Sequence, residues 1–573
     1  MKQWKLVTGS DGSAETLARQ ALLPLPLARL LVSRGITSSV EAERYLNPRL
    51  SDSSDPFLLP GMEAAVERIW KAISDKSPIA VHGDYDVDGV TSAALMSLVL
   101  TRLGAKVSRH LPNRMEDGYG LGLDAVERCI RDDKPGLIIT TDCGSSSHQA
   151  VAAARAAGVD IVVTDHHEIT GEPADALAVV NPKLGTDPSA RILSGVGVAF
   201  KVCHAVLKRG REHRRKIAAD LDLRQYLDLV ALGTVADVVP LRGENRILVR
   251  HGLAQLNRLE RVGLKVLAEV AGVKGEQGTY HVGFVLAPRM NAAGRLGNAG
   301  EALELLLTED AGEAERLALG LESSNKERKR IEVDIMEAAI AQIEATHDLA
   351  SHYGIVVGDV GWHIGVVGIV ASRLVSRYGR PAIVVGFDDE GRGRGSCRSV
   401  EGFDLLSGLA CCSDHLRRFG GHEMAAGLEV TQEHFGAFRA AFHGTCSDLL
   451  KGKSPPRTLL IDGWLTLQEI LEKGFVEVIS RMEPFGEGNP EPVWAIRNVQ
   501  VIGKPRLVGK AHMKMRVGVG ADSCEAIGFN MADRLADFPE GAIDIACMIR
   551  TNTYLGRTST QLHLLDFAPG LTP

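Results

Sequence analysis

Several features that place a protein in a membrane or outside the reducing cytoplasm are missing from this sequence. The nine cysteines are odd in number and form no CxxC pair, which argues against a disulfide framework and a thiolate zinc site. No window approaches roughly 20 uninterrupted apolar residues, so we predict no membrane-spanning helix. The first residues reach Asp11 and Glu15 without an apolar stretch, so we expect no signal peptide. These absences favour a cytoplasmic protein with no membrane partner.

An overall positive charge and a nucleotide-binding loop are also missing. The 65 Lys and Arg residues stand against 72 Asp and Glu, a formal net charge of −7, so any contact with phosphates must be local. The absence of a GxxxxGK[ST] loop disfavours a nucleoside triphosphatase. What remains, with 45% hydrophobic and 24% charged residues over 573 positions, is typical of a globular protein of several domains.

The periodicity of apolar residues changes twice along the chain. Short apolar runs alternate with helical patterns between 78 and 199, which indicates βα units on a parallel sheet. A charged stretch without proline at 310–346, with a polar segment at 322–330, predicts a long helix between two domains, after which βα alternation resumes. From 458 onward, short strands with turns predict a small β-barrel or sandwich.

We therefore predict an α/β fold class, with a parallel-sheet domain joined by a long helix to a smaller α/β domain and then a β-barrel. The expected boundaries are 1–77 for an N-terminal helical cap, 78–309 for the parallel-sheet domain, 310–347 for the linker helix, 348–457 for the second α/β domain and 458–573 for the barrel.

The first group of candidate ligands directly follows an apolar strand, in the segment HGDYDVDG at 82–89. Asp84, Asp86 and Asp88 repel one another strongly unless a cation lies between them. The alternatives are a solvated acidic turn and an EF-hand loop. The EF-hand is disfavoured because a buried-type strand comes before the loop and no Glu follows six residues after the glycine.

Three further segments carry acids or histidines at comparable places. Asp142 ends one apolar strand, the segment DHH at 165–167 ends another, and Asp237 is a single acid within an apolar helical pattern. A lone Asp at a strand end is more often a helix cap, but ligands bind outside the carboxyl ends of parallel strands, so these clusters should meet. Asp and His ligands without Cys favour Mn²⁺ or Mg²⁺, and this many carboxylates suit two ions at a phosphoester-cleaving site.

Seven motifs in order resemble the DHH phosphoesterase superfamily and, as a set, its RecJ family of single-strand-specific exonucleases. They are DYDVDG (84–89), NRMEDGYG (113–120), DCGSSS (142–147), DHH (165–167), GVGVAF (195–200), GTVADVVPL (233–241) and NAAGR (291–295). The resemblance implies a DHH domain, a long helix, a DHHA1 domain and an OB-fold.

The resemblance also implies how the ligands are shared between two ions. One ion would be held by Asp88, Asp142, His166 and Asp237. Asp86 and the bridging Asp142 would hold the other, with Asp84 or His82 completing it. His167 is expected to face the scissile phosphate.

The second α/β zone contains the Gly- and Arg-rich segment 391–399 and the segment FGGH at 419–422. Glycine lets backbone N–H groups approach an anion and arginine binds phosphate bidentately, although a flexible basic loop with a tight turn is the alternative. The resemblance implies that these segments bind the substrate's phosphates together with residues of the DHH domain. The residues concerned are Asn113, Arg114, Arg295, Ser396, Arg398 and His422.

In the C-terminal zone, residues 504–516 carry five positive charges and no acid. On a strand, Lys510, His512, Lys514 and Arg516 would share one face, which is either a solvated surface or a track for a single strand's backbone. Aromatic residues that could stack on bases are sparse there, so electrostatic binding is favoured. The candidates for stacking are Phe485, Trp494 and Phe529.

Together, the residues predict metal-dependent phosphoester chemistry, and the resemblance implies 5′ to 3′ degradation of single-stranded DNA to mononucleotides in repair and recombination. One alternative is a phosphodiesterase for oligoribonucleotides or cyclic dinucleotides, whose relatives are shorter and lack the barrel. Another is a non-catalytic DNA-binding scaffold, whose relatives have lost ligands that this sequence keeps. The resemblance also implies a single-strand-binding protein and a RecQ-like helicase as partners, and we expect a monomer.

Overall fold

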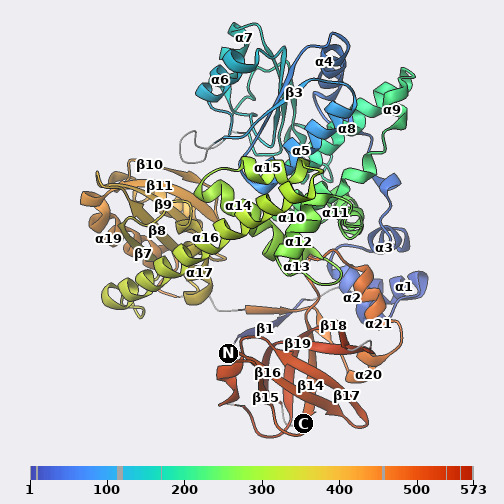
Figure 1. Cartoon of the computed structure of the whole chain (residues 1–573). Coiled ribbons are helices and arrows are strands. Elements are labelled where there is room, and N and C mark those ends of the chain that lie inside the picture. Colours follow the sequence, from blue (N-terminus) through green and yellow to red (C-terminus); the bar gives the residue numbers. More distant parts are fainter. Residues whose placement is uncertain are drawn as a thin grey trace.

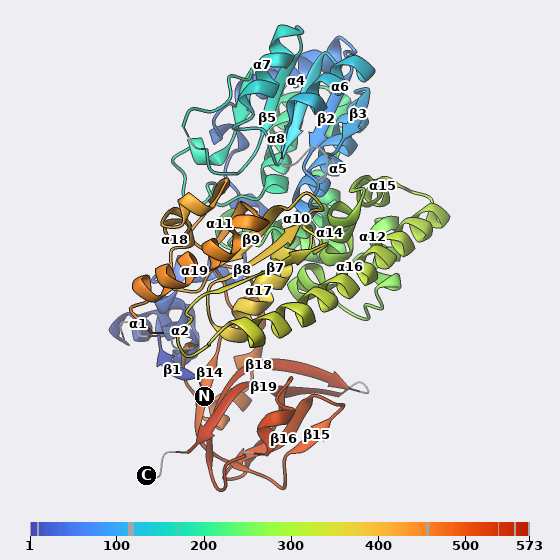
Figure 2. The same ribbon diagram turned by 90° about the vertical axis from the view of Figure 1, so that its left-hand side faces the viewer.

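The computed structural model of the chain contains three bodies, each with its own sheet (Figure 1). A parallel sheet with its helices forms one body, a mixed sheet next to the long helix α16 (Ala311–Thr346) forms the second, and a β-barrel forms the third. The barrel and the parallel sheet lie at opposite ends of the molecule in both views (Figures 1 and 2). The structure describes residues 2–7, 11–112, 120–169, 171–453, 458–536, 538–554 and 557–570.

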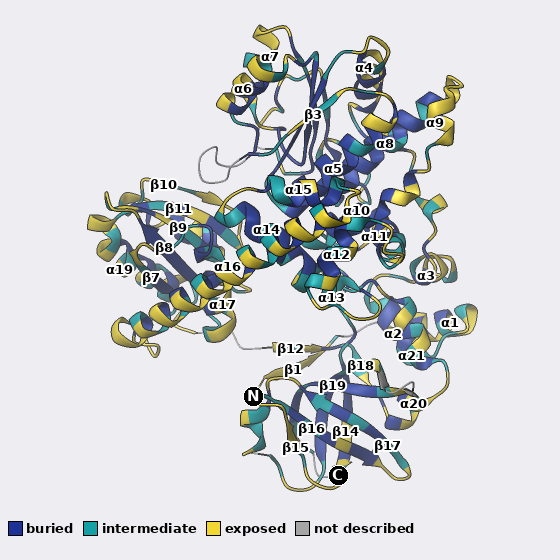
Figure 3. Cartoon of the chain, in the orientation of Figure 1, coloured by how far each residue is buried: buried dark blue, intermediate teal, exposed yellow. Residues whose placement is uncertain are grey.

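The first sheet is parallel throughout, with the strand order β3-β2-β4-β5-β6. Its strands are β2 (Ile79–Gly83), β3 (Val107–His110), β4 (Leu137–Thr141), β5 (Asp160–Thr164) and β6 (Ala178–Val180). Every residue of β2 and β4 is buried because helices cover both faces of the sheet (Figure 3). The two strands that follow β2 in the chain, β3 and β4, lie on opposite sides of it. The loops after β2 and β4 therefore meet at the place where ligands bind in such sheets.

Helices of two groups cover this sheet. Helices α4 (Met62–Ser74), α5 (Val87–Arg102) and α8 (Gly195–Glu212) share a core with one face, while α6 (Leu123–Asp133) and α7 (His148–Ala156) cover the other. The remaining helices of this body are α9 (Lys216–Asp220), α10 (Leu227–Ala236), α11 (Gly243–Leu256), α12 (Val262–Val270), α13 (Thr279–His281), the π-helical turn η5 (Val282–Leu286), α14 (Ala287–Leu296) and α15 (Gly300–Leu307). Short 3-10 turns are η1 (Leu50–Asp52), η2 (Pro56–Leu58), η3 (Pro182–Leu184), η4 (Leu223–Tyr226), η6 (Ser413–His415) and η7 (Ala532–Leu535).

Helix α16 continues without a break through the polar segment 322–330. Polar side chains of this segment form ion pairs. Arg328 donates to Glu332 at 2.5 Å, and Arg289 of α14 pairs with Glu322 at 2.6 Å. Because Arg328 and Glu332 are buried together, the loss of apolar periodicity marks a polar contact and not an interruption.

The second sheet has the order β10-β11-β9-β8-β7. Its strands are β7 (Ile355–Val360), β8 (Ala382–Phe387), β9 (Arg392–Arg398), β10 (Arg418–Gly421) and β11 (Ala425–Thr431), and its helices are α17 (Val367–Tyr378), α18 (Leu405–Ala410) and α19 (Gln432–Leu449). The Gly- and Arg-rich segment is thus the strand β9, paired on both sides, and not a flexible loop.

The third sheet has the order β13-β14-β18-β19-β17-β16-β15, and an additional pairing of β14 with β16 closes five strands into a barrel. Its strands are β13 (Gly463–Trp464), β14 (Trp494–Val501), β15 (Arg506–Val508), β16 (His512–Val519), β17 (Asp522–Gly528), β18 (Ile543–Tyr554) and β19 (Arg557–Pro569), with helices α20 (Leu467–Leu471) and α21 (Phe475–Arg481). The predicted fold class, a parallel-sheet domain, a smaller α/β domain and a barrel, is confirmed.

The prediction of one N-terminal helical cap over 1–77 is wrong. Strand β1 (Gln3–Leu6) pairs in parallel with β12 (Thr458–Ile461), and α1 (Asp11–Ala21), α2 (Leu25–Ser33) and α3 (Ser39–Leu46) share the core of the barrel. Helix α4 instead packs on the parallel sheet. Apolar periodicity shows that these helices have a buried face, but it cannot show that the partner lies more than 400 residues further along the chain. In the described part of the chain, no helix is long and apolar enough to cross a membrane.

Candidate metal centre

The loop after β2 places three carboxylates at the start of α5. Asp84 is completely buried. Asp86 is the N-cap of α5, and its Oδ1 accepts two backbone N–H groups of the first turn at 3.0 and 3.1 Å. The two oxygens of Asp88 accept the backbone N–H groups of Gly195 (2.7 Å) and Val196 (2.9 Å) at the N-terminus of α8. The N-terminal ends of two helices therefore fix this group of negative charges.

The loop after β4 brings Asp142 against the same helix end. Asp142 is 1% exposed, has a left-handed backbone with φ of 65°, and donates its N–H to the carbonyl of Thr164 at 2.9 Å. A Cβ at Gly195 would lie 2.3 Å from Asp142 Oδ1. The motif GVGVAF therefore needs glycine at this position so that the carboxylate can approach the start of α8.

The DHH loop after β5 is organised by Asp165. This carboxylate accepts the backbone N–H groups of Ser145, His166 and His167 at 2.7–3.2 Å, and it lies 2.8 Å from His167 Nδ1. His166 Nε2 lies 3.1 Å from Asp142 Oδ1 and within 3.8 Å of carboxylate oxygens of two other acids, Asp88 and Asp237. Asp165 therefore positions both histidines.

Asp237 joins the cluster from α10. It is the C-terminal cap of this helix, and not a residue inside a helical pattern, because the next residue, Val238, has a positive φ of 61° that ends the helix. Its side chain is 22% exposed, so the cluster opens to solvent on this side. A cavity of about 280 Å³ lies there, lined among others by Asp86, Asp237, Asn291 and Arg295.

Without a cation, the carboxylates disturb one another's ionisation strongly. Burial and then the charge of Asp86 raise the pKa of Asp88 to about 7, and burial with the charges of Asp88 and Asp86 raises the pKa of Asp237 to about 9. Burial and the neighbouring acids also raise the pKa of Asp142. Burial lowers the pKa of His166 to about 4, so its imidazole is neutral and can act as a metal ligand.

The donor atoms fit divalent cations. Asp142 Oδ1, His166 Nε2 and Asp237 Oδ2 are buried and make no hydrogen bond to any described residue, although they converge. Ligand atoms within 4.8 Å of one another form the groups Asp88–His166–Asp237, Asp142–His166–His167 and Asp84–Asp86–Asp142. Asp142 and His166 each belong to two of these groups, and of the two only the carboxylate of Asp142 can be shared between neighbouring ions. His82 is 3% exposed and belongs to none of the groups found among the described residues.

The predicted phosphate-binding residues lie in two bodies. Arg295 lines the cavity and donates to the carbonyl of Gly365 in the second α/β body at 2.9 Å. On β9, Arg398 Nη1 donates to Ser396 Oγ at 3.0 Å. His422 is exposed and directly follows β10. Asn113 and Arg114 lie outside the described residues.

The basic segment of the barrel differs in part from the prediction. His512, Lys514 and Arg516 alternate along β16 with buried apolar residues, but Lys510 lies in the turn before the strand and does not share its face. Lys514 Nζ pairs with Glu525 of β17 at 2.9 Å, so its charge is partly neutralised. Of the three aromatic candidates, Trp494 is 1% exposed and packs in the core, whereas Phe529 is 49% exposed and lies between His512 and His563.

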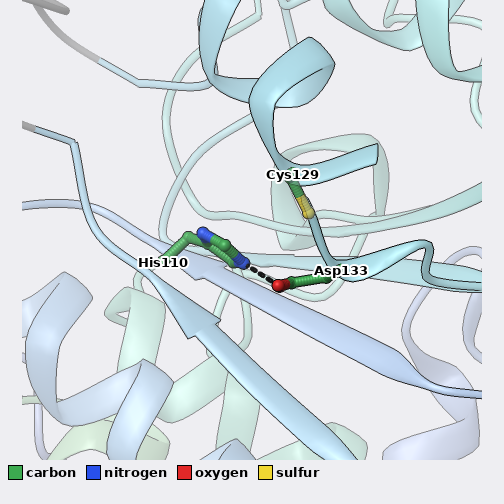
Figure 4. Close-up of side chains that lie close together, drawn as sticks. All are labelled: His110, Cys129 and Asp133. Carbon is green, nitrogen blue, oxygen red and sulfur yellow. Dashed lines mark hydrogen bonds and ion pairs between the residues drawn. The ribbon is translucent and has the colours of Figure 1, made fainter. Parts of the chain in front are cut away.

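Another group of donor atoms lies between β3 and α6 (Figure 4). His110 Nε2 is hydrogen-bonded to Asp133 Oδ2 at 2.5 Å, with Cys129 close by. Burial, with the charges of Asp133 and Asp132, raises the pKa of the Cys129 thiol to about 12. The hydrogen bond between His110 and Asp133 connects β3 to α6, and the Cys129 thiol beside it is protonated. Neither β3 nor α6 contributes a residue to the metal centre.

Sequence reasoning missed two residues that shape the centre. Asp165 was recognised only as part of a motif, and its role depends on four hydrogen-bond donors that come together on folding. Asn291 Oδ1 accepts the backbone N–H of Val87 at 3.2 Å and so ties α14 to the loop after β2. The Asn that opens the motif NAAGR is the signal in the sequence that points to this contact.

Three family models match the chain in the order of its bodies. They are the DHH family N-terminal domain at 78–234, the DHHA1 domain at 352–448 and the RecJ OB domain at 461–566. The single-stranded-DNA-specific exonucleases RecJ of Haemophilus influenzae and Dickeya dadantii are 39% and 37% identical to the chain, and each match covers 94% of this chain and 95% of the relative. This chain belongs to the RecJ family.

Solved structures of the RecJ family agree over the whole chain. The crystal structure of RecJ from Thermus thermophilus in complex with Mn²⁺ has a TM-score of 0.83 at 30% identity and covers 100% of this chain and 80% of that chain. The complex of the same protein with Mg²⁺ has a TM-score of 0.77 at 28% identity and covers 100% of this chain and 79% of the other. The three bodies of this chain are therefore arranged relative to one another as in the RecJ structures.

Proposed function

We propose that this chain is a metal-dependent exonuclease that degrades single-stranded DNA from the 5′ end to mononucleotides, in DNA repair and recombination. The observation that carries the proposal is the convergence of Asp88, Asp142, His166 and Asp237 on one buried cluster next to a cavity lined by Arg295. The relatives named as single-stranded-DNA-specific exonucleases, and the RecJ structures holding Mn²⁺ or Mg²⁺, support it.

We assign one Mn²⁺ or Mg²⁺ ion to Asp88, Asp142, His166 and Asp237, and a second to Asp84, Asp86 and the shared Asp142. The grouping of ligand atoms favours Asp84 over His82 for the second ion. Two such ions supply an activated water and stabilise the leaving oxygen of a phosphodiester.

The chain's own residues hold the substrate against this centre. Burial lowers the pKa of His167, but the hydrogen bond and charge of Asp165 outweigh it and raise this pKa overall, so that a protonated imidazole can donate to a phosphate oxygen. Arg398 and Ser396 on β9, and His422 after β10, offer donors to a terminal phosphate from the second α/β body. Asn113 and Arg114 are assigned to the same role by the family resemblance alone.

The proposal extends to the surroundings of the enzyme. An enzyme that degrades single-stranded DNA works where DNA is exposed, so we assign it to the cytoplasm, where its nine free cysteines remain reduced. A single-strand-binding protein and a RecQ-like helicase, which would supply single strands, are the proposed partners of a monomeric enzyme.

Incubation of the purified protein with Mn²⁺ or Mg²⁺ and single strands labelled at either end tests the proposal. We expect a 5′ label to appear at once as a mononucleotide, while a 3′ label remains on progressively shorter strands. A duplex with blunt ends and the variant Asp142→Asn serve as controls and should give no product. Products that appear first from the 3′ end, or no metal-dependent cleavage, would contradict the proposal.

A further inference from the structure

The group formed by His110, Cys129 and Asp133 takes no part in the proposed reaction, yet it combines three kinds of metal-binding side chain. His110 is the last residue of β3, and Cys129 and Asp133 lie four residues apart at the end of α6. Residues at this spacing are neighbours on one face of a helix. Both side chains of the helix therefore meet the end of the strand (Figure 4).

The donor atoms of this group are close enough to share one ion. An imidazole nitrogen, a thiol sulfur and a carboxylate oxygen all lie within 4.8 Å of one another, and Figure 4 shows the sulfur of Cys129 directed toward the pair of His110 and Asp133. Ligands of a tetrahedral zinc ion are about 3.3 to 3.6 Å apart, as its bond lengths require. Movements of about 1 Å, within the reach of side-chain rotation, therefore bring the three donors around one ion.

The charges at this place favour a cation. Asp133 is ionised, because hydrogen bonds from Ser108 and His110 hold its pKa below the usual value. Burial and then the charge of Asp133 raise the pKa of the Cys129 thiol to about 12, so the sulfur keeps its proton in the absence of metal. A divalent cation reverses this balance, since it neutralises the carboxylate, binds the sulfur as a thiolate and releases the thiol proton to solvent.

The site is shielded on one side and open on the other. Cys129 is 2% exposed, whereas the side chains of His110 and Asp133 are 30% and 28% exposed. His110 also lines a cavity of about 420 Å³, together with residues of α15 and α16. An ion can therefore enter from solvent, and water can take the fourth position, as it does at zinc sites with three protein ligands.

The kinds of donor atom distinguish this group from the metal centre. Thiolate and imidazole together favour Zn²⁺, whereas Mg²⁺ and Mn²⁺ favour carboxylate oxygens. Among the described residues, the donor groups of the metal centre contain no cysteine. The absence of a CxxC pair in the sequence argues against zinc sites built on two neighbouring cysteines, but it has no bearing on a site with a single one.

We propose that His110, Cys129 and Asp133 bind one Zn²⁺ ion, which fastens the end of β3 to α6. These two elements stand on either side of the motif NRMEDGYG in the chain: β3 ends before the motif begins at 113, and α6 starts after it, at Leu123. The zinc ion therefore fixes the two structural elements from which this segment extends. The inference does not depend on the proposed function.

Binding of Co²⁺ to the full metal-free chain tests the site, because a thiolate ligand gives Co²⁺ an intense charge-transfer band in the near ultraviolet and oxygen or nitrogen ligands do not. Excess Mg²⁺ is present throughout to occupy the metal centre. We expect one thiolate-bound Co²⁺ per chain, which one equivalent of Zn²⁺ displaces. Cys129→Ser should lack the band. Cys411→Ser removes the exposed cysteine and is the matched control, which should keep the band.

Two further variants each remove one of the other ligands at similar size. His110→Gln and Asp133→Asn should weaken Co²⁺ binding at least about 10-fold to 100-fold, the cost of losing even a residue that only orients a ligand. Thermal unfolding in chelator shows whether each variant still folds, and each should keep one cooperative transition. Zn²⁺ should raise the Tm of the parent more than that of Cys129→Ser, because the variant has lost one of the sites that Zn²⁺ occupies.

Hydrogen exchange tests whether the ion fastens the two elements. Zn²⁺ should slow exchange of backbone amides in β3 and in the last turn of α6 in the parent, but not in Cys129→Ser. Three outcomes would overturn the site: no thiolate band in the parent, a band that persists in Cys129→Ser, or equal slowing of exchange in both proteins. None of these measurements uses DNA or cleavage, so their failure leaves the proposed function unaffected.

Discussion

The metal centre and the basic face of the barrel are built in opposite ways. In the metal centre, Asp88, Asp142 and Asp165 are buried, and backbone N–H groups or the start of a helix hold each one in place. On the barrel, Lys514 and Arg516 extend from β16 toward solvent, and one of them is partly neutralised by an acid. Metal chemistry requires fixed ligand positions, whereas a flexible backbone of phosphates can be followed by long, mobile side chains.

This difference predicts two kinds of response to substitution. Loss of one ligand in the buried centre should remove activity almost completely, because the ligands act together. Loss of one charge on the barrel should change affinity by a small, additive step.

Asp142→Asn should have the largest effect. Asn has nearly the same volume and tolerates the left-handed backbone at this position, so the fold should persist. Removing the shared negative charge should reduce cleavage by at least about 10³-fold, since both ions lose a ligand. The checks are the single-turnover rate at saturating Mn²⁺ and strand affinity with chelated metal. A near-normal rate would refute the shared-ligand assignment, and a large loss of strand affinity would mean that the barrel does not bind independently.

Asp165→Asn tests whether positioning alone matters as much as ligation. The variant keeps the shape but loses the negative charge that raises the pKa of His167, so that pKa should fall. We expect a loss of cleavage on the order of 10²-fold, the scale of losses at residues that orient metal ligands. NMR titration of His167 in the metal-free protein separates this role from a merely structural one. An unchanged His167 pKa would contradict it.

The same contrast explains what could be read from the sequence. The proposed ligands Asp84 and Asp142 directly follow strands and Asp88 lies in the first turn of the next helix, so motif and strand order are enough to predict that these carboxylates come together. The barrel was recognised as a class of structure, but its faces were not: Trp494 is in the core, and Lys510 is in a turn. Which face of a strand is buried depends on its neighbours in the sheet.

Long-range packing explains the other failures. The helices α1–α3 show apolar faces, but their partners are β14, β16 and other elements of the barrel, which periodicity cannot identify. A buried site leaves marks in the sequence because its residue types are unusual, whereas an exposed one depends on where neighbouring elements end.

Acidity links the metal centre to stability. In the metal-free protein, Asp88 and Asp237 have pKa values of about 7 and about 9, above those of carboxyls in an unfolded chain. The folded state therefore binds protons more tightly, and this contribution to stability is complete below about pH 4 and is lost as the pH rises through about 7 and then about 9. Mn²⁺ displaces these protons, so its affinity should rise with pH by up to about 10-fold per unit for each proton released.

Thermal unfolding in chelator and in Mn²⁺, between about pH 6 and pH 9, measures this linkage. The difference in Tm between the two conditions should widen as the pH rises. Asp237→Asn removes the upper part of the titration and is the matched control. A Tm difference that does not change with pH in the parent protein would show that the carboxylates are already ionised without metal.

Arg398 tests whether the second α/β body recognises the end of the strand. Replacing it with Ala should reduce the preference for a 5′-phosphorylated over a 5′-hydroxyl end by roughly 10-fold, because a charge-assisted bond to the extra phosphate is lost. Arg398→Lys keeps the charge without the bidentate geometry and should give an intermediate value. The comparison of kcat/KM on the two ends decides it. Equal losses on both would assign Arg398 to the strand backbone instead.

The smallest steps are expected on the basic segment of the barrel, and point variants are the right test there. Removing the whole barrel would expose the apolar faces of α1–α3, which share its core, so a truncated chain would report on folding as well as binding.

In Lys510→Ala, the slope of log affinity against log salt should become shallower by about 0.7, the value for one phosphate contact with a single strand. Lys514 is held by Glu525 at 2.9 Å, so Lys514→Ala should change the slope less. Glu525→Gln releases this lysine and should make the slope steeper by up to about 0.7. Salt titrations of all three variants with chelated metal measure these steps. Identical slopes in all of them would mean that this segment does not follow the strand, and the contrast between a rigid centre and a graded binding face would fail at the barrel.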